Sequence, residues 1–432
     1  MASNESNLPG TAALERAIEP RGLAAIFRSL RYRDFALFWT GNFLSNIGTW
    51  MQNLALGWLI LLMTNSPFLL GLNGFLSQSP ALVFSLPGGA IADRLNRRKM
   101  MITTQSALML LALVLAVLTS AHWITIGGIL LIGLLSGVAS ALNSPAYQAM
   151  VPDLVEREAL MNAIALNSAQ FNMSRAIGPT IAGLALGLLG AAGCFYLNSL
   201  SFLPLIVALV IIRVGPPHAS EEGPSVWQAM LEGLRFVRAH RLLIILLSIP
   251  TFLSVFTLPF IVLMPVIARD LLGVGASGLG FLMAGAGVGA VIAALTLAAQ
   301  GDIEHKGRYI LSSSAILSLA LILLSQARSF WWAFSLLVVL GFMMVGALAL
   351  TNTTLQLASP PHLRGRIMSM YNLTVLGFAP LGNLQVGAVA EALGTRFALA
   401  LGGAICLIYF LIVLALLPRL REEARLPRPT EE

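Results

Sequence analysis

One arginine, Arg175, lies about 15 residues inside the apolar segment that begins at Leu160. At about 1.5 Å of rise per residue, an α-helix places it roughly 22 Å from the segment's start, where its side chain reaches water with difficulty. A guanidinium stays charged and needs a partner, and no Asp or Glu lies at that depth. Two roles fit. Arg175 attracts an anionic group of a bound molecule, or amides such as those of Asn42, Asn46 or Gln78 hold it structurally.

Uncharged polar side chains recur in other apolar segments. In lipid such groups commonly join neighbouring helices, so packing is the alternative to binding for each of them. Aromatic side chains that could form walls of the same site are Phe43, Trp50, Phe252 and Phe256. The candidates for contact with a small molecule, besides Arg175, are Asn42, Asn46, Asn143, Gln170, Thr251, Asn352 and Tyr371.

Patterns typical of catalysis or metal binding are missing from the sequence. It has no Gly-x-Ser-x-Gly, His-Glu-x-x-His or Walker A pattern. The five histidines are scattered in loops and near segment ends, without metal-ligand spacing. We therefore expect no enzyme, no metal centre and no cofactor.

Five ionic groups are crowded between two apolar segments. Because charges of this kind are too costly at the centre of a bilayer, they predict a short loop at a membrane face. The full pattern is Gly89-x-x-x-Asp93-Arg94-x-x-Arg97-Arg98, followed by Lys99.

A second pattern follows Arg175 directly. Small residues recur at Gly178, Gly183 and Gly187, which lets helices approach closely. Pro179 removes one backbone hydrogen bond and permits a bend. Tight helix packing alone would also account for this pattern.

The composition indicates that membrane-spanning helices position these residues. The chain is 57% hydrophobic and 10% charged, against about 25% charged residues in a typical soluble protein. With a mean hydropathy of +0.84, this predicts an all-α integral membrane protein. The net charge of +7 then reflects membrane orientation and not nucleic-acid binding. Cys194 and Cys406 both lie in apolar runs and are expected to be reduced.

Twelve apolar segments are long enough to span a hydrocarbon core of about 30 Å. They form a first six-helix bundle over 35–212 and a second over 242–417, between tails at 1–34 and 418–432. The expected spans are 35–62, 68–92, 100–120, 124–146, 160–188, 190–212, 242–268, 276–299, 309–326, 330–354, 368–392 and 396–417.

The two bundles resemble each other in sequence. Gln148 and Pro152 recur as Gln356 and Pro360, both with an offset of 208. This predicts a tandem repeat, an arrangement that transporters use to alternate access around a site between the halves. The polar stretch 213–241 between them predicts an amphipathic helix on the membrane surface, because apolar residues recur at helical spacing from Trp227 to Val237.

The positive charges predict an orientation. If both termini are cytoplasmic, all but four of the 26 Lys and Arg residues lie on the cytoplasmic side. The exceptions are Arg175, within the membrane, and Arg269, Arg328 and Arg396, outside.

The Gly89–Arg98 pattern resembles the loop between the second and third helices of the major facilitator superfamily of transporters, with Asn96 in place of a second glycine. The Gly178-Pro179 pattern partly resembles a fifth-helix motif of exporters in that superfamily, although Ser174 and Ala182 stand where glycine is common. The segment that begins Leu30-Arg-Tyr-Arg-Asp-Phe and the Asn143-Ser-Pro sequence resemble one bacterial subgroup, which includes siderophore exporters and macrolide efflux proteins. The resemblance covers about residues 28–420.

This resemblance implies a secondary active exporter of small amphipathic molecules, a siderophore or a drug, working by alternating access as a monomer in the bacterial inner membrane. It also implies that Asp93 accepts hydrogen bonds at the start of the eleventh helix, near Arg366. The residues implied in conformational gating are Gly89, Asp93, Arg94, Arg97, Arg98, Gly178, Pro179 and Arg366.

Two alternatives remain open at this point. Related facilitators move lysophospholipids, so a lipid transporter is the nearer one. A membrane receptor or assembly factor that transports nothing is the other, and it would not need a central polar cavity.

Overall fold

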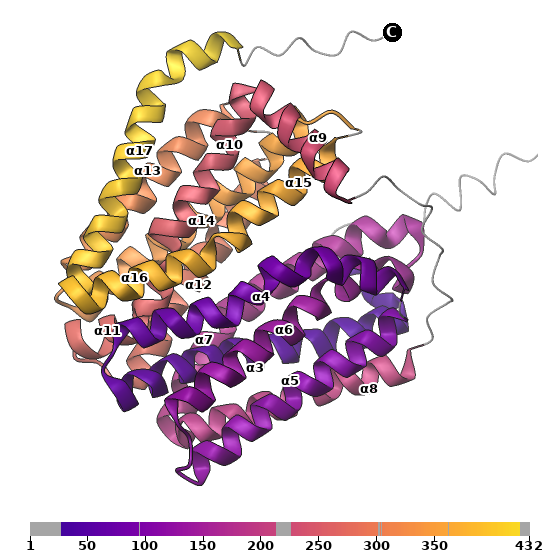
Figure 1. Ribbon diagram of the computed structural model, residues 1–432, viewed down its shortest axis with the longest axis vertical. Helices are drawn as coiled ribbons and strands as arrows, with labels where there is room; N and C mark the ends of the chain where they lie inside the picture. The colour runs from indigo at the N-terminus through magenta and orange to yellow at the C-terminus, as the bar shows by residue number, and fades with distance from the viewer. Residues whose placement is uncertain are drawn as a thin grey trace, which may run out of the picture.

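The computed structural model describes residues 27–94, 96–212, 226–300, 303, 305–361 and 363–423. Within them it contains helices and no strand. Figure 1 shows two helical bundles, the N-terminal half in indigo to magenta and the C-terminal half in pink to yellow. The bundles meet near α11 (Met264–Val266), α16 (Ala379–Leu393) and the start of α4 (Pro67–Arg94), and they diverge toward α9 (Val226–Ala239). We call these two ends of the molecule the distal end and the linker end (Figure 1).

The N-terminal half is built from long helices that are straight over most of their length. A short 3-10 helix, Arg28–Arg31, precedes them, and two more, Val151–Leu154 and Arg157–Ala159, join α6 to α7. The helices are α3 (Arg33–Thr64), α4 (Pro67–Arg94), α5 (Arg97–Ser120), α6 (Ile126–Met150), α7 (Leu160–Ser201) and α8 (Leu203–Ile211).

The helix α7 contains two membrane crossings. Gly190 interrupts it with φ +68°, a backbone conformation that glycine adopts without steric cost. Before the break, α7 runs parallel to α3, and after it the chain runs antiparallel to α3. The parallel contacts are Trp39 with Leu166 and Trp50 with Gly178, and the antiparallel ones are Gly48 with Ser201 and Gly41 with Leu205.

The C-terminal half has more irregular helices. Pro250, Pro259 and Pro265 each remove a backbone donor, and the helix around them passes through π and 3-10 turns. The elements are α9 (Val226–Ala239), α10 (Arg241–Phe252), η5 (Leu253–Thr257), η6 (Leu258–Leu263), α11 (Met264–Val266), η7 (Ile267–Leu271), α12 (Ala276–Gln300), α13 (Lys306–Ser325), α14 (Phe330–Ala358), α15 (Arg364–Asn372), η8 (Leu373–Gly377), α16 (Ala379–Leu393) and α17 (Thr395–Glu423).

Ten described segments are long and apolar enough to span a membrane. One of them, Arg157–Ile211, is 55 residues long and is divided at Gly190. The helix α4 is not among the ten, but it has 28 residues and packs against α6 and α16. Large apolar side chains cover the outer surfaces, such as Leu188 at 83% and Leu295 at 66% exposure. An outer surface of this kind suits lipid, so the expected twelve-helix membrane fold fits the structure.

The linker helix α9 forms as the sequence predicts. Its place on the membrane surface stays a prediction, and α9 packs against α10 and α15 of the C-terminal half. Val237 is only 4% exposed there and belongs to a large cluster of buried apolar residues. Burial of one apolar face against protein therefore fixes this helix to the C-terminal half.

The two halves meet along two pairs of helices. The helix α4 packs against α16, and α7 packs against α12. Glycines permit both contacts, because a Cβ added to Gly71 would lie 2.4 Å from the carbonyl oxygen of Asn383. A Cβ added to Gly287 would lie 2.6 Å from the Cα of Ala176. Side chains at these positions would force the halves apart.

Candidate functional site

The helix α7 contacts both halves along two of its faces. On one face, Ser174 donates to the carbonyl oxygen of Phe43 in α3 at 3.4 Å, and Gly178 lies against Trp50. On another face, Ala176 and Gly183 lie against glycines of α12. Two exposed faces remain between these packed faces, one on each side of the helix.

The two exposed faces of α7 differ in polarity. One carries Ile177, Ile181 and Leu184, which are 37%, 40% and 48% exposed. The other follows the spacing i, i+3, i+4, i+7 and carries Ser168, Phe171, Asn172 and Arg175. Because charged side chains in membrane helices face a polar interior and not lipid, the second face points into the space between the halves.

Arg175 is half-buried, and one hydrogen bond is described for it. Its Nη2 atom donates to Oδ1 of Asn172, one turn earlier on the same helix, at 3.1 Å. A guanidinium has five N–H donors, so four of them have no described partner in the protein. The amides of Asn42, Asn46 and Gln78, which the sequence suggested as structural partners, do not bond to it among the described residues. The remaining donors are therefore available to an acceptor from outside the protein.

Aromatic side chains flank this charge. Phe171 lies one turn before Arg175 and is 49% exposed. Its ring packs edge-on against that of Trp50 in α3, with ring centroids 6.5 Å apart. Earlier in α3, the rings of Trp39 and Phe43 stack with their centroids 5.6 Å apart. Sequence reasoning proposed Phe43 and Trp50 as aromatic walls but did not single out Phe171, although its spacing from Arg175 could have shown it.

Two of the predicted binding residues are buried within the N-terminal half. Asn42 donates to Oη of Tyr147 at 2.9 Å and to Oε1 of Gln170 at 2.9 Å, and Tyr147 in turn bonds Asn167. Gln170 has no exposed surface. In this conformation Asn42 and Gln170 therefore join α3, α6 and α7. Asn46, by contrast, is half-exposed and has no hydrogen-bond partner among the described residues.

The remaining predicted binding residues bond mainly to neighbouring helices or to their own. Asn143 accepts from Oγ1 of Thr104 in α5 at 2.9 Å. Tyr371 donates to the carbonyl oxygen of Leu348 at 3.0 Å, and Asn352 accepts from Gln356 at 2.6 Å. Thr251 donates to the backbone of Leu247 at 2.8 Å. Asn143 and Tyr371 therefore connect neighbouring helices, whereas Asn352 and Thr251 bond within their own helices and remain partly exposed.

A matching bond appears in the two halves. In α14, Gln356 donates to Asn352, and in α6 the equivalent Gln148 donates to Ser144 at 3.4 Å. The helices α6 and α14 end at Met150 and Ala358, again 208 residues apart. The repeat seen in the sequence thus coincides with equivalent helix ends and equivalent side-chain bonds.

The charged loop after α4 braces the linker end of the N-terminal half. Arg97 forms an ion pair of 3.0 Å with Asp153 and donates to the carbonyl oxygen of Ala149 at 3.3 Å. Arg98 donates to the carbonyl oxygens of Leu209 and Val210, where its charge suits the C-terminus of α8. The helix α4 includes Gly89, Asp93 and Arg94, but the surroundings of Gly89 and the side chains of Asp93 and Arg94 lie outside what the structure describes.

Arg366 forms an ion pair with Glu232 of the linker helix α9, which packs against α15. The sequence predicts that Arg366 also lies near Asp93, at the start of the eleventh helix. The side chain of Asp93 lies outside the described residues, so this contact stays a prediction.

The glycines after Arg175 contact two different partners. Gly178 lies against Trp50 of α3, within the N-terminal half. Gly183 and Gly187 instead lie against Gly280 and Ser277 of α12, in the other half. The predicted exporter motif is therefore a junction where one helix packs closely against both halves.

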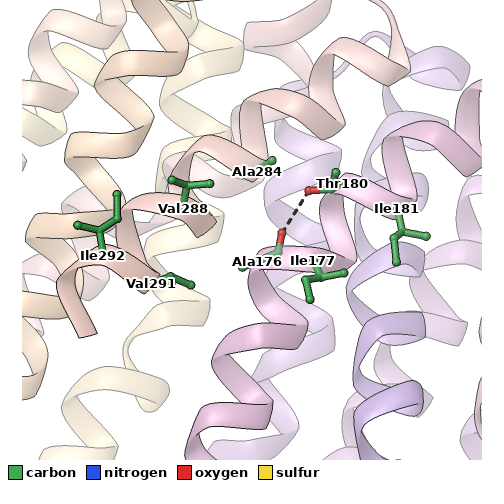
Figure 2. Close-up of a pocket in the computed structure, with 8 residues that line it drawn as sticks. All are labelled: Ala176, Ile177, Thr180, Ile181, Ala284, Val288, Val291 and Ile292. Carbon is green, nitrogen blue, oxygen red and sulfur yellow. Dashed lines mark hydrogen bonds between the residues drawn. The ribbon is translucent and has the colours of Figure 1, made fainter. Parts of the chain in front are cut away.

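An apolar pocket of about 350 Å³ lies between α7 and α12. Figure 2 shows its lining, in which Thr180 is polar but donates to the carbonyl oxygen of Ala176 at 3.3 Å. The pocket involves the lipid-type face of α7, away from Arg175. Its lining residues are Ala176, Ile177, Thr180, Ile181, Ala284, Val288, Val291 and Ile292.

Three proteins of assigned function are similar to this chain. It is 33% identical to the staphyloferrin A transporter of Staphylococcus aureus over 176 residues, which are 39% of this chain and 44% of that protein. It is 25% identical to the multidrug efflux pump Tap of Mycolicibacterium fortuitum, over 87% of this chain and 93% of that protein. It is 29% identical to the enterobactin exporter EntS of Shigella boydii, over 90% of this chain and 93% of that protein.

The fold is also found among solved transporter structures. A bacterial homologue of the human lysosomal transporter Spinster superposes with a TM-score of 0.69, at 14% identity, over 90% of this chain and 97% of that one. Residues 24–430 match the family described as transmembrane secretion effectors. The chain therefore belongs to this family of transporters in the major facilitator superfamily.

Proposed function

We propose that this protein exports small amphipathic molecules, a siderophore or a drug, across the bacterial inner membrane. The similar exporters of siderophores and the similar efflux pump support this substrate range. A lipid substrate is not favoured, because those relatives are described as exporters of siderophores or drugs. The protein acts as a monomer among membrane lipids, with both termini in the cytoplasm, as the placement of its positive charges favours.

The observation that carries the proposal is the polar face of α7. Placing a charge in a membrane helix costs about 2.5–3.5 kcal/mol on insertion scales. Asn172 accepts one hydrogen bond from Arg175, which leaves most of the guanidinium's N–H donors without a described partner. An anionic group on the substrate would supply the missing acceptors, and Phe171 and Trp50 would contact its apolar part. We infer that Arg175 and Asn46, which is half-exposed on α3, bind the substrate.

Alternating access accounts for the arrangement of the halves. They contact each other at the distal end and diverge toward the linker end (Figure 1). Within the part of the chain that is described, no carboxylate lies beside Arg175 in the membrane interior, so the site does not depend on an internal ion pair. A substrate anion would then be the counter-ion that Arg175 lacks.

Transport into inside-out vesicles tests this proposal with one anionic and one neutral amphipathic compound. We expect Arg175→Gln to lose transport of the anionic compound and to keep that of the neutral one. Arg175→Lys should keep part of the activity, because the charge stays while the planar fork is lost. Asn172→Ala is the matched control, since it removes the described partner and keeps the charge. Equal loss for both compounds, with a lower melting temperature, would show a structural role instead.

A further inference from the structure

Two charged side chains of the C-terminal half contact the short connection between α3 and α4 at the distal end. Nη1 of Arg269 donates to Oδ1 of Asn65 at 2.7 Å and to the carbonyl oxygen of Leu61 at 3.2 Å. From the other side, a carboxylate oxygen of Glu391 accepts from Oγ of Ser66 at 2.8 Å. The same oxygen accepts from the backbone N–H of Phe68 at 3.2 Å.

Each charge matches the helix end that it contacts. The carbonyl of Leu61 belongs to the last turn of α3, where the helix dipole is negative, and it receives the cation. The N–H of Phe68 belongs to the first turn of α4, where the dipole is positive, and it receives the anion. The C-terminal half thus caps both helix ends of one connection in the N-terminal half. We call this contact the distal clasp: Arg269 and Glu391 on Asn65–Ser66.

The backbone conformation of the connection and its own hydrogen bonds suit this contact. Asn65 adopts a left-handed conformation, with φ 53°, which asparagine tolerates better than most residues. Ser66 accepts from the N–H of Leu69 at 3.3 Å and so also caps α4 from within its own chain segment. On the other side, Asp270 binds the guanidinium of Arg269 at 2.5 Å and 3.1 Å, which orients it.

The clasp contains all the hydrogen bonds that join the two halves within the described part of the chain. There are four such bonds. The described ion pairs at the linker end remain within one half each. Arg97 pairs with Asp153 in the N-terminal half, and Arg366 pairs with Glu232 of the C-terminal side. Polar contacts between the halves are therefore concentrated at the end where the bundles meet.

We propose that Arg269 and Glu391 are gating residues of the transport cycle, which hold the distal end closed by capping α3 and α4 across the two halves. To open that end, the protein must break all four bonds at once. The clasp thereby sets how often the substrate site opens on that side. The proposal rests on alternating access as part of the proposed function, but it does not depend on which compound is transported.

Thiol labelling of a buried position beneath the clasp tests the proposal. Asn383 of α16 lies against Gly71 of α4 and is 4% exposed, so Asn383→Cys reports opening of the distal end. In intact cells, a membrane-impermeant maleimide should label this cysteine slowly. We expect Glu391→Gln and Arg269→Gln to raise the labelling rate roughly two- to fivefold, as loss of a helix-end charge interaction predicts. Glu391→Lys should raise it further, because it reverses the charge at the start of α4.

Two controls make the labelling specific. Arg396→Gln removes an exposed cation at the same end that has no described ion pair, and it should leave the rate unchanged. The protein without Asn383→Cys gives the background from Cys194 and Cys406, which are both buried. An unchanged rate in all clasp variants, or an equal rise with Arg396→Gln, would overturn the proposal.

Cross-linking provides a second measurement that does not depend on labelling rates. In Ser66→Cys with Glu391→Cys, a short bifunctional thiol reagent should join the two halves and abolish transport. Continued transport after complete cross-linking would show that the clasp need not open. Because labelling requires no substrate, a wrong choice of substrate class would leave the labelling pattern intact and would fail only the transport assay.

Discussion

Gly183 of α7 and Gly280 of α12 meet backbone to backbone across the two halves. A Cβ added to Gly183 would lie 2.6 Å from the Cα of Gly280. Atoms do not approach so closely, so a side chain at either position must separate the helices. The contact between the halves therefore depends on two residues that have no side chain.

Enlarging Gly183 should impair both stability and transport. We expect Gly183→Val to lower the free energy of unfolding in detergent by about 1–3 kcal/mol, the usual cost of overpacking, and to reduce transport. Gly127→Ala is the control, since nothing lies within 4 Å of a Cβ added there. Thermal unfolding and vesicle transport of the two variants check this. Normal stability of Gly183→Val would mean that the halves do not need this close approach.

The ion pair between Arg97 and Asp153 should stabilise the N-terminal half. Their side chains are only 17% and 22% exposed, so Asp153→Asn leaves a largely buried cation without its carboxylate. We expect a loss of about 1–3 kcal/mol in denaturant unfolding. The exposed pair of Arg28 and Glu158, at 3.5 Å, provides the comparison, and Glu158→Gln should change stability by less than about 1 kcal/mol. Equal effects of the two changes would contradict this interpretation.

The ion pair between Arg366 and Glu232 should hold the linker helix on the C-terminal half. Glu232→Gln removes the charge that binds Arg366, so the amides of α9 should exchange hydrogen faster. The effect on global stability should stay within about 1 kcal/mol, because the side chain of Glu232 is 58% exposed. Arg238→Gln, on an exposed position of the same helix, is the control and should leave exchange unchanged.

The orientation of the chain can be tested from outside the cell. Single cysteines at Ser120, directly at the end of α5, or at Ser329, directly before α14, should react with an impermeant thiol reagent. A cysteine at Gly223, in the segment between the halves, should not react. Labelling at Gly223 from the periplasm would overturn the cytoplasmic placement of the linker.

The sequence by itself determined the class of protein and most of its elements. Lipid cannot satisfy backbone donors and acceptors, so long apolar segments must become helices. The helices α3 and α13 accordingly differ from the expected spans by only a few residues at each end. The break at Gly190 falls at the first residue of the predicted span 190–212, and the linker helix α9 forms where its apolar spacing indicated.

Only the tertiary structure decided which polar groups meet. Ser66 and Glu391 are 325 residues apart, and no local pattern links them. Asn42 and Gln170 looked like binding residues, yet they bond to each other, because helix register brings their amides together. Arg366 likewise pairs with Glu232 because helix packing brings the two side chains together. Hydropathy is a property of each segment alone, whereas a hydrogen bond between helices depends on the rotation and offset of both, which packing of the whole molecule fixes.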